Sequence, residues 1–176
     1  PMGLERTGYL PLRRFPKSEV IPSSVDRFLR KTTLQGFVHD EASAFFGGLA
    51  GNAGLFSTAR DVARVYQMLL NGGEIDGQRY LSKETCQLFT TETSKISRRG
   101  LGFDKPDADD PKKGNCAPAA PAEVYGHTGF TGTCAWVDPV NELVYVFLSN
   151  RIYPDVTNRK LNQLHIRERI QGAIYD

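Results

Sequence analysis

Apolar residues follow a strand-like pattern between residues 124 and 149. Residues 133–137 alternate around Cys134 and Trp136, and residues 143–148 form the apolar run Leu-Val-Tyr-Val-Phe-Leu. The Asp-Pro-Val-Asn-Glu segment between them has the composition of a turn. This pattern predicts a β-hairpin whose second strand is buried.

A helix is predicted after Thr58, where apolar residues recur at intervals of three and four. Thr58 and Asp61 have the spacing of a capping box, and Gly72 with Gly73 is expected to end the helix. Its apolar stripe comprises Val62, Val65, Tyr66, Leu69 and Leu70.

Two further helices follow from capping residues and apolar spacing. Ser82 is expected to cap a helix that runs to about residue 91 and buries Cys86, or Leu88 with Phe89. Residues 158–174 are expected to form an amphipathic helix that packs on the sheet. Its apolar side contains Leu161, Leu164, His165, Ile170 and Ile174.

The other segments are predicted to be mostly irregular. Four prolines make residues 1–24 an expected extended surface segment, after which Ser23 or Ser24 would cap a short helical turn through Arg30. Residues 36–40 are expected to be loop, Asp40 would cap a short turn over residues 41–46, and residues 47–54 would be irregular backbone. Residues 100–104 read as a strand and residues 105–121 as an exposed loop. The element order predicts an α+β fold with an antiparallel β-sheet flanked by helices.

Composition excludes several classes of function. The chain has 176 residues, of which 40% are hydrophobic, and 22 basic residues stand against 20 acidic ones. A net charge of +2 spread along the chain gives no support for nucleic-acid binding. No apolar run approaches the ~18 residues of a membrane-spanning helix. We therefore expect no nucleic-acid partner and no transmembrane segment.

Cysteine and histidine do not indicate a metal site. Cys86, Cys116 and Cys134 are odd in number and widely spaced, so free or buried thiols are the simplest interpretation, although a disulfide from Cys86 or Cys116 stays open. The three histidines are too dispersed for zinc. We predict no metal and no cofactor.

The candidate chemistry lies in residues 126–133, Gly-His-Thr-Gly-Phe-Thr-Gly-Thr, at the head of the predicted hairpin. This run places an imidazole, a hydroxyl and three glycines together. It resembles the Lys/His-Thr/Ser-Gly triplet of serine β-lactamases, penicillin-binding proteins and their esterase relatives, in particular the class C-like branch. Further segments resemble that family in family order: residues 1–4, 47–58, 101–103 and 137–139.

The resemblance implies a serine hydrolase acting on amide or ester carbonyls through an acyl-serine intermediate. The nucleophile of that family lies in a Ser-x-x-Lys motif, and no serine of this chain has lysine three residues on. We therefore expect residues 1–176 to be the C-terminal portion of a β-lactamase-like catalytic domain whose N-terminal part carries the nucleophile. The chain alone would be inactive and would self-associate through exposed apolar surface. The substrate would be a small molecule or peptidoglycan-like, and only the resemblance suggests a periplasmic or exported protein.

The resemblance also assigns roles to individual residues. His127, Thr128 and the backbone N–H of Phe130 are the expected catalytic groups, with Phe130 as an oxyanion donor. Gly129, Tyr125 and Arg151 are the expected substrate-binding residues. From their places beside the triplet and at the end of the return strand, Tyr125 would shape the pocket wall and Arg151 would reach into the cleft, with a solvated Arg151 as an equal alternative. Histidine in place of lysine favours the esterase-like or broad-specificity branch.

Other interpretations of these residues stay open. His39 is expected to make a structural polar contact rather than line the cleft, and His165 to be packed or half-exposed. A non-catalytic binding or structural module on the same scaffold is the main alternative to an enzyme. A complete small esterase using His127 and an internal serine such as Ser57 is a third, but Ser57 lacks a Gly-x-Ser-x-Gly context.

Overall fold

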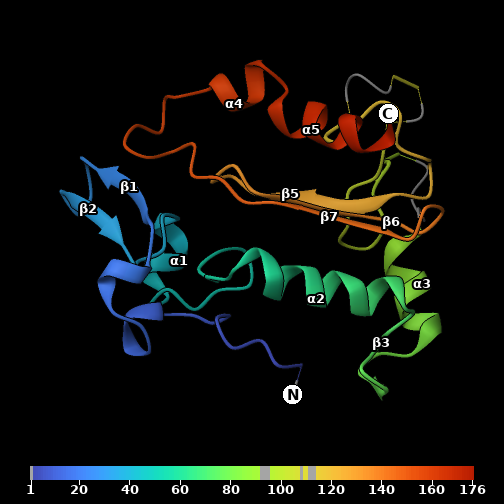
Figure 1. Cartoon of the computed structure of the whole chain (residues 1–176). Helices are drawn as coiled ribbons and strands as arrows, with labels where there is room; N and C mark the ends of the chain where they lie inside the picture. Colours follow the sequence, from blue (N-terminus) through green and yellow to red (C-terminus); the bar gives the residue numbers. More distant parts are fainter. Residues whose placement is uncertain (1, 92–95, 108, 111–113) are drawn as a thin grey trace.

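The centre of the molecule is a three-stranded antiparallel sheet in the order β5-β6-β7 (Figure 1). The computed structural model describes residues 2–91, 96–107, 109–110 and 114–176. Strands β5 (Tyr125–Thr128), β6 (Cys134–Asp138) and β7 (Leu143–Phe147) pair in register, with Tyr125 opposite Val137 and Asp138 opposite Leu143. The predicted hairpin is therefore confirmed.

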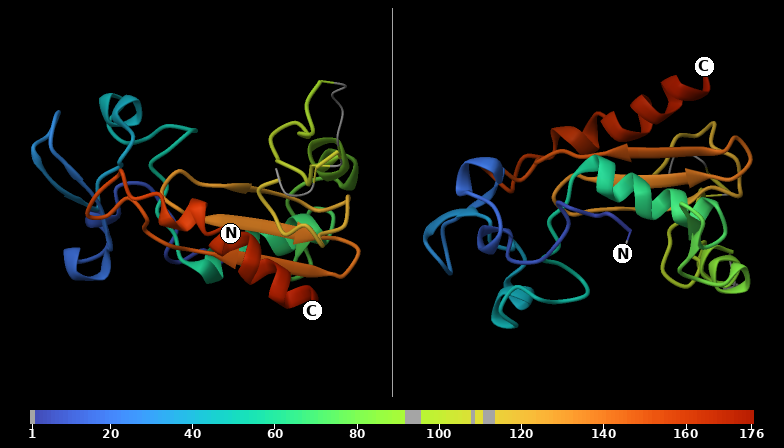
Figure 2. Two further views of the ribbon diagram at one scale, coloured as in Figure 1. Left: turned by 90° about the horizontal axis from the view of Figure 1, so that it is seen from above. Right: turned by 60° about the horizontal axis from the view of Figure 1, so that its bottom comes forward.

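Helices cover both faces of this sheet, which confirms the α+β fold. Helix α2 (Ala59–Leu70) packs against β6 and β7 on one face, and α4 (Lys160–Gln163) with α5 (Ile166–Tyr175) lies over the other (Figures 1 and 2). Tyrosine hydroxyls fix α5 to the sheet, since Tyr145 donates to the carbonyl of Arg167 at 3.1 Å and Tyr175 to Asp138 at 2.8 Å.

Smaller elements lie at the two ends of the sheet (Figure 1). At one end are 3₁₀ helices Pro11–Arg13 and Lys17–Glu19 and helix α1 (Glu41–Phe45), together with the hairpin of β1 (Pro22–Asp26) and β2 (Thr32–Gln35). At the other are β3 (Glu74–Ile75), β4 (Gln78–Arg79) and α3 (Lys83–Thr90).

Helix caps occur where the sequence predicts them. The side chains of Asp40, Thr58 and Ser82 each accept a hydrogen bond from the backbone N–H three residues on. Only half of the expected capping box forms, because the Asp61 carboxylate accepts from the Arg6 amide and the Thr7 hydroxyl, both at 2.8 Å. That carboxylate therefore ties the N-terminal segment to α2.

Several local predictions are wrong. The turn expected after Ser23 or Ser24 is strand β1, which pairs with β2 around the buried Leu34. Residues 100–104 form no strand but a single bridge, between Asp104 and Gly126. The segment expected to be an exposed loop contains buried residues: Lys105, Cys116 and Ala117. Residues 108 and 111–113 of that segment lie outside the described residues.

The C-terminal helix also differs from its prediction. His165 adopts φ +49°, which separates α4 from α5, and its side chain is exposed. Arg167 and Gln171 face inward, whereas Ile170 and Ile174 are 42% and 48% exposed. Hydrogen bonds explain this orientation, because Gln171 accepts from the Ala117 amide and Arg167 donates to the Thr133 carbonyl.

The core under α5 is small and contains sulfur and aromatic groups. It comprises Cys116, Val124, Cys134, Trp136 and Tyr145. All three cysteines are free and buried, and burial raises the pKa of the Cys134 thiol to about 11. Cys86 is buried in α3 as expected, but Leu88 and Phe89 are exposed.

Large apolar side chains are exposed near α1, where Phe45 and Phe46 are 79% and 75% exposed. Self-association through such surface stays a prediction. Among the described residues, no helix has the length and apolar character needed to cross a membrane.

Candidate active site

The His-Thr-Gly triplet begins on β5, the strand at one edge of the central sheet. The antiparallel pairing of β5 with β6 sets His127 opposite Ala135 and Thr128 opposite Cys134. Since successive side chains alternate between faces, His127 shares a face with Tyr125, and Thr128 shares the other face with Gly126. On its outer side β5 meets the bridge residue Asp104, which exchanges two backbone hydrogen bonds with Gly126 at 2.7 and 3.0 Å.

A tight turn follows the triplet and leaves one backbone donor open. The Gly129 amide donates to the Thr133 carbonyl at 2.7 Å, and the Gly132 amide donates to the Gly129 carbonyl at 2.9 Å. The Phe130 amide between them donates to no acceptor among the described residues. A Cβ at residue 129 would lie 2.3 Å from Thr133 Oγ1, so a larger residue there would require the Thr133 side chain to move.

The His127 imidazole has a partner at each nitrogen. Nδ1 lies 2.6 Å from the Thr128 carbonyl oxygen, and Nε2 lies 3.3 Å from Nη1 of Arg99. Arg99 is a residue that the sequence analysis did not single out. Nothing in the local sequence indicated it, because 28 positions separate it from His127.

The Phe130 ring lies between other candidate residues. Its centroid is 5.4 Å from that of the nearly parallel His39 ring, and the Arg151 guanidinium lies 4.6 Å from the Phe130 centroid. His39 also makes the expected polar contact, since Nδ1 lies 2.9 Å from the Ser24 hydroxyl. His39, Phe130 and Arg151 thus meet beside the turn.

Arg151 connects the turn to a basic hollow. An open hollow of 470 Å³ is lined by Arg151, Arg159, Asn162 and Gln163. Burial, followed by the nearby charges of Arg167 and Arg159, lowers the pKa of Arg151. These positive charges make the hollow suitable for an anion.

Tyr125 occupies a different environment from the one expected. It is only 5% exposed, and its ring packs edge-on against Phe103 at 5.4 Å. Burial raises its pKa, with smaller contributions from Cys86 and Tyr66. Tyr125 is therefore a core residue in this structure, and its expected contact with substrate stays a prediction.

A buried carboxylate, also missed from the sequence, holds the outer side of β5. Asp104 is 1% exposed and binds Arg98 and Asn115, each at 2.8 Å. Burial acts to raise its pKa, but the hydrogen bonds from Asn115 and Arg98 prevail and lower it.

Comparison with known proteins identifies the family of this chain. The family model described as β-lactamase matches residues 5–168. The chain belongs to the β-lactamase family. The resemblance drawn from the triplet and the ordered segments is thereby confirmed.

Relatives of this β-lactamase family member carry the name of a carboxypeptidase. Proteins named putative D-alanyl-D-alanine carboxypeptidase from Escherichia coli K12 and Salmonella typhi are each 34% identical over an alignment of 174 positions that covers 92% of this chain. The chain spans 40% of the length of these curated relatives. A β-lactamase structure from Mycobacterium bovis aligns with a TM-score of 0.52 at 21% identity, over 69% of this chain and 44% of that one, which supports the fold.

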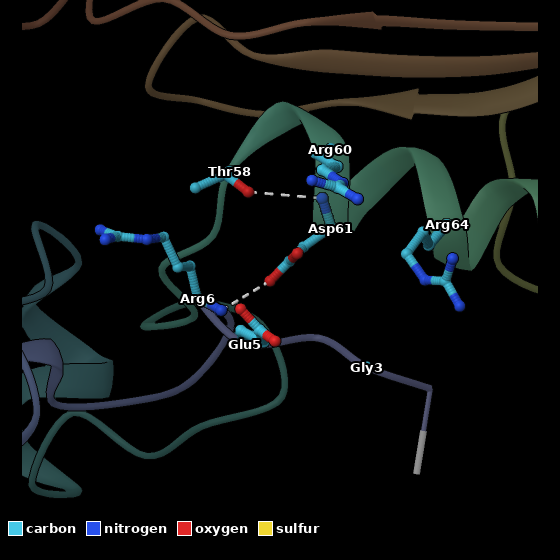
Figure 3. Close-up of a pocket in the computed structure, with 7 residues that line it drawn as sticks. All are labelled: Gly3, Glu5, Arg6, Thr58, Arg60, Asp61 and Arg64. Carbon is cyan, nitrogen blue, oxygen red and sulfur yellow. Dashed lines mark hydrogen bonds between the residues drawn. The ribbon is translucent and has the colours of Figure 1, made fainter.

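A second hollow of this family member lies at the start of α2 (Figure 3). It is lined by Gly3, Glu5, Arg6, Thr58, Arg60, Asp61 and Arg64. No residue of the triplet or its turn lines it, and Figure 3 shows the Asp61 carboxylate directed to the Arg6 amide. We interpret it as the joint between the N-terminal segment and α2. Among the described residues, no cluster of three His, Cys, Asp or Glu side chains could hold a metal ion.

The stability of this β-lactamase family member is expected to depend on His39 at mildly acidic pH. Burial, and next the charge of Arg30, lower the pKa of His39 below the ordinary 6.5. Because the unfolded chain then binds more protons, the folded state should lose stability as the pH falls below 6.5.

Urea unfolding of the wild type and His39→Gln at a series of pH values checks this expectation. The variant should lose less stability than the wild type over that range. His165→Gln, at an exposed histidine, should show the same dependence of unfolding free energy on pH as the wild type. Equal pH dependences for the wild type and His39→Gln would contradict the role given to His39.

Proposed function

We propose that this chain forms the oxyanion-binding wall of a serine hydrolase that cleaves amide or ester carbonyls through an acyl-serine intermediate. The observation that carries the proposal is the N–H of Phe130, which has no acceptor within the part of the chain that the structure describes and is held on a turn directly after His127-Thr128-Gly129 at the sheet edge. An acyl-transfer enzyme needs such a fixed donor where negative charge develops on the carbonyl oxygen.

Thr128 and Gly129, the two residues before Phe130, also support this proposal. The Thr128 hydroxyl makes no hydrogen bond with a described residue, so it is available to a substrate or to a nucleophile's proton network. Gly129 fixes the turn through Thr133, which keeps the Phe130 amide in position. His127 begins the triplet and presents an imidazole beside both.

We further propose a substrate with a negatively charged end. The hollow formed by Arg151, Arg159, Asn162 and Gln163 adjoins the turn through the contact of Arg151 with Phe130. Two guanidinium groups and two amides match a carboxylate. The relatives' name, D-alanyl-D-alanine carboxypeptidase, denotes a peptide substrate with a free carboxylate, so a peptidoglycan-like peptide is the proposed substrate class.

The nucleophile is proposed to come from a portion of the domain beyond residues 1–176. The sequence has no Ser-x-x-Lys. Ser57, the internal alternative, contacts the Thr7 hydroxyl at 2.7 Å and the Thr58 carbonyl at 3.3 Å, which is a structural role. An internal Ser57 esterase is therefore not supported.

The chain by itself is expected to be catalytically silent. Incubation with a chromogenic β-lactam or a p-nitrophenyl ester should give no burst of product and no covalent adduct by mass spectrometry. A stoichiometric adduct on any serine of this chain would contradict the proposal.

The oxyanion role is tested in a longer protein that contains this chain and has hydrolase activity. Phe130→Pro removes the backbone N–H and is expected to lower kcat about 10²–10³-fold. Phe130→Ala removes the ring but keeps the N–H, and should lower kcat far less. Equal losses for the two variants would rule out the backbone donor.

A non-catalytic module on the same scaffold is the second candidate, because the chain lacks Ser-x-x-Lys. The sequence that precedes residue 1 in the whole protein separates the two. A Ser-x-x-Lys together with Tyr-x-Asn there favours the enzyme, whereas an unrelated domain favours the module.

A further inference from the structure

The segment before Asp104 is held against the strand that carries the triplet. The backbone of Asp104 pairs with Gly126, and its carboxylate, which is 1% exposed, accepts a hydrogen bond from Arg98 Nη2 at 3.0 Å and lies 2.8 Å from Arg98 Nε. The Asn115 amide donates to the same carboxylate. The fold thereby fixes residues 98–104 beside His127, although these two segments are far apart in the sequence.

Arg99 extends from this segment toward the triplet. Its Nε lies 3.9 Å from Asp104 Oδ1, and its Nη1 lies 3.3 Å from Nε2 of His127. The Arg99 side chain is 51% exposed, so part of its guanidinium also faces solvent. A positive charge thus stands next to the imidazole.

The two contacts of His127 specify one state of its ring. The Thr128 carbonyl can only accept, so Nδ1, at 2.6 Å, must carry a hydrogen. Arginine can only donate, so Nε2 must be the unprotonated nitrogen. The imidazole that satisfies both contacts is neutral and protonated at Nδ1.

We propose that Arg99 is a positioning residue that holds His127 in the neutral, Nδ1-protonated form and supplies the permanent positive charge beside the triplet. In family members whose triplet begins with lysine, one side chain provides that charge. In this chain the task is divided, since the imidazole provides an acceptor at Nε2 and the guanidinium provides the cation.

This pairing of a neutral His127 imidazole with the Arg99 cation has a chemical consequence, which rests on the proposed function. With its lone pair on Nε2, His127 cannot donate a proton from that atom to a substrate. The charged hydrogen-bond donor beside His127 is the exposed part of the Arg99 guanidinium, which prefers a carboxylate or another planar anion. Arg99 would therefore favour substrates with an anionic group near the scissile bond.

The ring state can be tested on this chain without any activity. Imidazole ¹⁵N spectra distinguish the two neutral tautomers, and loss of signals in His127→Gln assigns the ring. The wild type and Arg99→Lys should both show Nδ1–H and a bare Nε2. Arg99→Glu replaces the donor by an acceptor while the Thr128 carbonyl still requires Nδ1–H, so the population of rings that carry a hydrogen at Nε2 should rise about tenfold.

Arg13→Glu is the matched control, because Arg13 is exposed and lies in a separate 3₁₀ helix. It should leave the His127 spectrum unchanged. An Nε2–H tautomer in the wild type would overturn the proposal even if Arg99→Glu failed to fold. Identical His127 spectra for Arg99→Glu and Arg13→Glu would overturn the role of Arg99.

A kinetic measurement on a longer, active protein tests whether the positive charge of Arg99 favours anionic substrates. Arg99→Gln should lower kcat/KM about tenfold or more for a peptide with a free terminal carboxylate, and much less for its amide, whereas Arg13→Gln should change neither. Equal losses on both peptides would overturn the charge assignment. If no hydrolysis occurs in any longer protein, the proposed function fails while the spectra still decide the ring state.

Discussion

Replacing Asp104 by alanine is expected to lower the free energy of unfolding by about 3 kcal/mol. The carboxylate is almost fully buried and binds Arg98, Asn115 and the Lys105 amide. Its removal leaves the Arg98 guanidinium without its anion and two further donors without an acceptor. The loss should be at the lower end of the range for a broken buried pair, because the Arg98 side chain is 33% exposed.

Urea unfolding of Asp104→Ala and Asp104→Asn measures the loss and separates charge from shape. The asparagine variant keeps the volume and should lose less than the alanine variant. Asp109→Ala, at an exposed carboxylate in the same region, is the control and should change little. Equal losses for Asp104→Ala and Asp109→Ala would show that the buried cluster adds no stability.

The direction of the Asp104 pKa shift determines how its contribution to the free energy of unfolding depends on pH. The folded state lowers the pKa of this carboxyl below the ordinary 3.8. The unfolded chain therefore binds its proton first as the pH falls. The stabilisation is complete above pH 3.8 and is lost as the pH falls through the lowered pKa.

Gly126→Ala is expected to destabilise the protein by about 3 kcal/mol, the upper part of the usual range for overpacking. An added Cβ would lie 2.1 Å from the Ala135 carbonyl oxygen and 2.7 Å from Cε3 of Trp136. Neither neighbour can move freely, because Ala135 belongs to the central strand and Trp136 is 2% exposed. The cost therefore arises from displacement of β5 as a whole.

Gly102→Ala is the matched control, since nothing lies within 4 Å of a Cβ at that position. Its free energy of unfolding, measured with urea, should stay within about 1 kcal/mol of the wild type. Amide exchange at Gly129 and Phe130 would report whether Gly126→Ala also disturbs the turn. A Gly126→Ala protein as stable as Gly102→Ala would contradict the close packing of β5 on Trp136.

The sequence predicts those parts of the fold that local chemistry determines. The hairpin around Trp136 and the caps at Asp40, Thr58 and Ser82 each depend on residues close in the chain, and each is confirmed. The triplet could also be placed on a sheet edge, because the hairpin follows it directly.

Long-range partners account for the parts that the sequence does not predict. In α5 the apolar spacing indicates the wrong face, because Arg167 and Gln171 find backbone partners at Thr133 and Ala117. Tyr125 reads as a pocket residue beside the triplet, yet strand alternation directs it into the core against Phe103. Arg99 approaches His127 only because Asp104 pairs with Gly126.

The contact of Gly126 with Trp136 also determines how β5 can align with its neighbour. A shift of one position along β6 would bring Tyr125 or His127 opposite the indole, and each carries a side chain where only a hydrogen atom fits. A one-residue slip would also reverse the faces of every later side chain in the strand. The packing of Trp136 against Gly126 therefore permits a single register of β5 on β6. That register sets the face of the sheet on which the His127 imidazole lies, although Trp136 itself takes no part in the proposed chemistry.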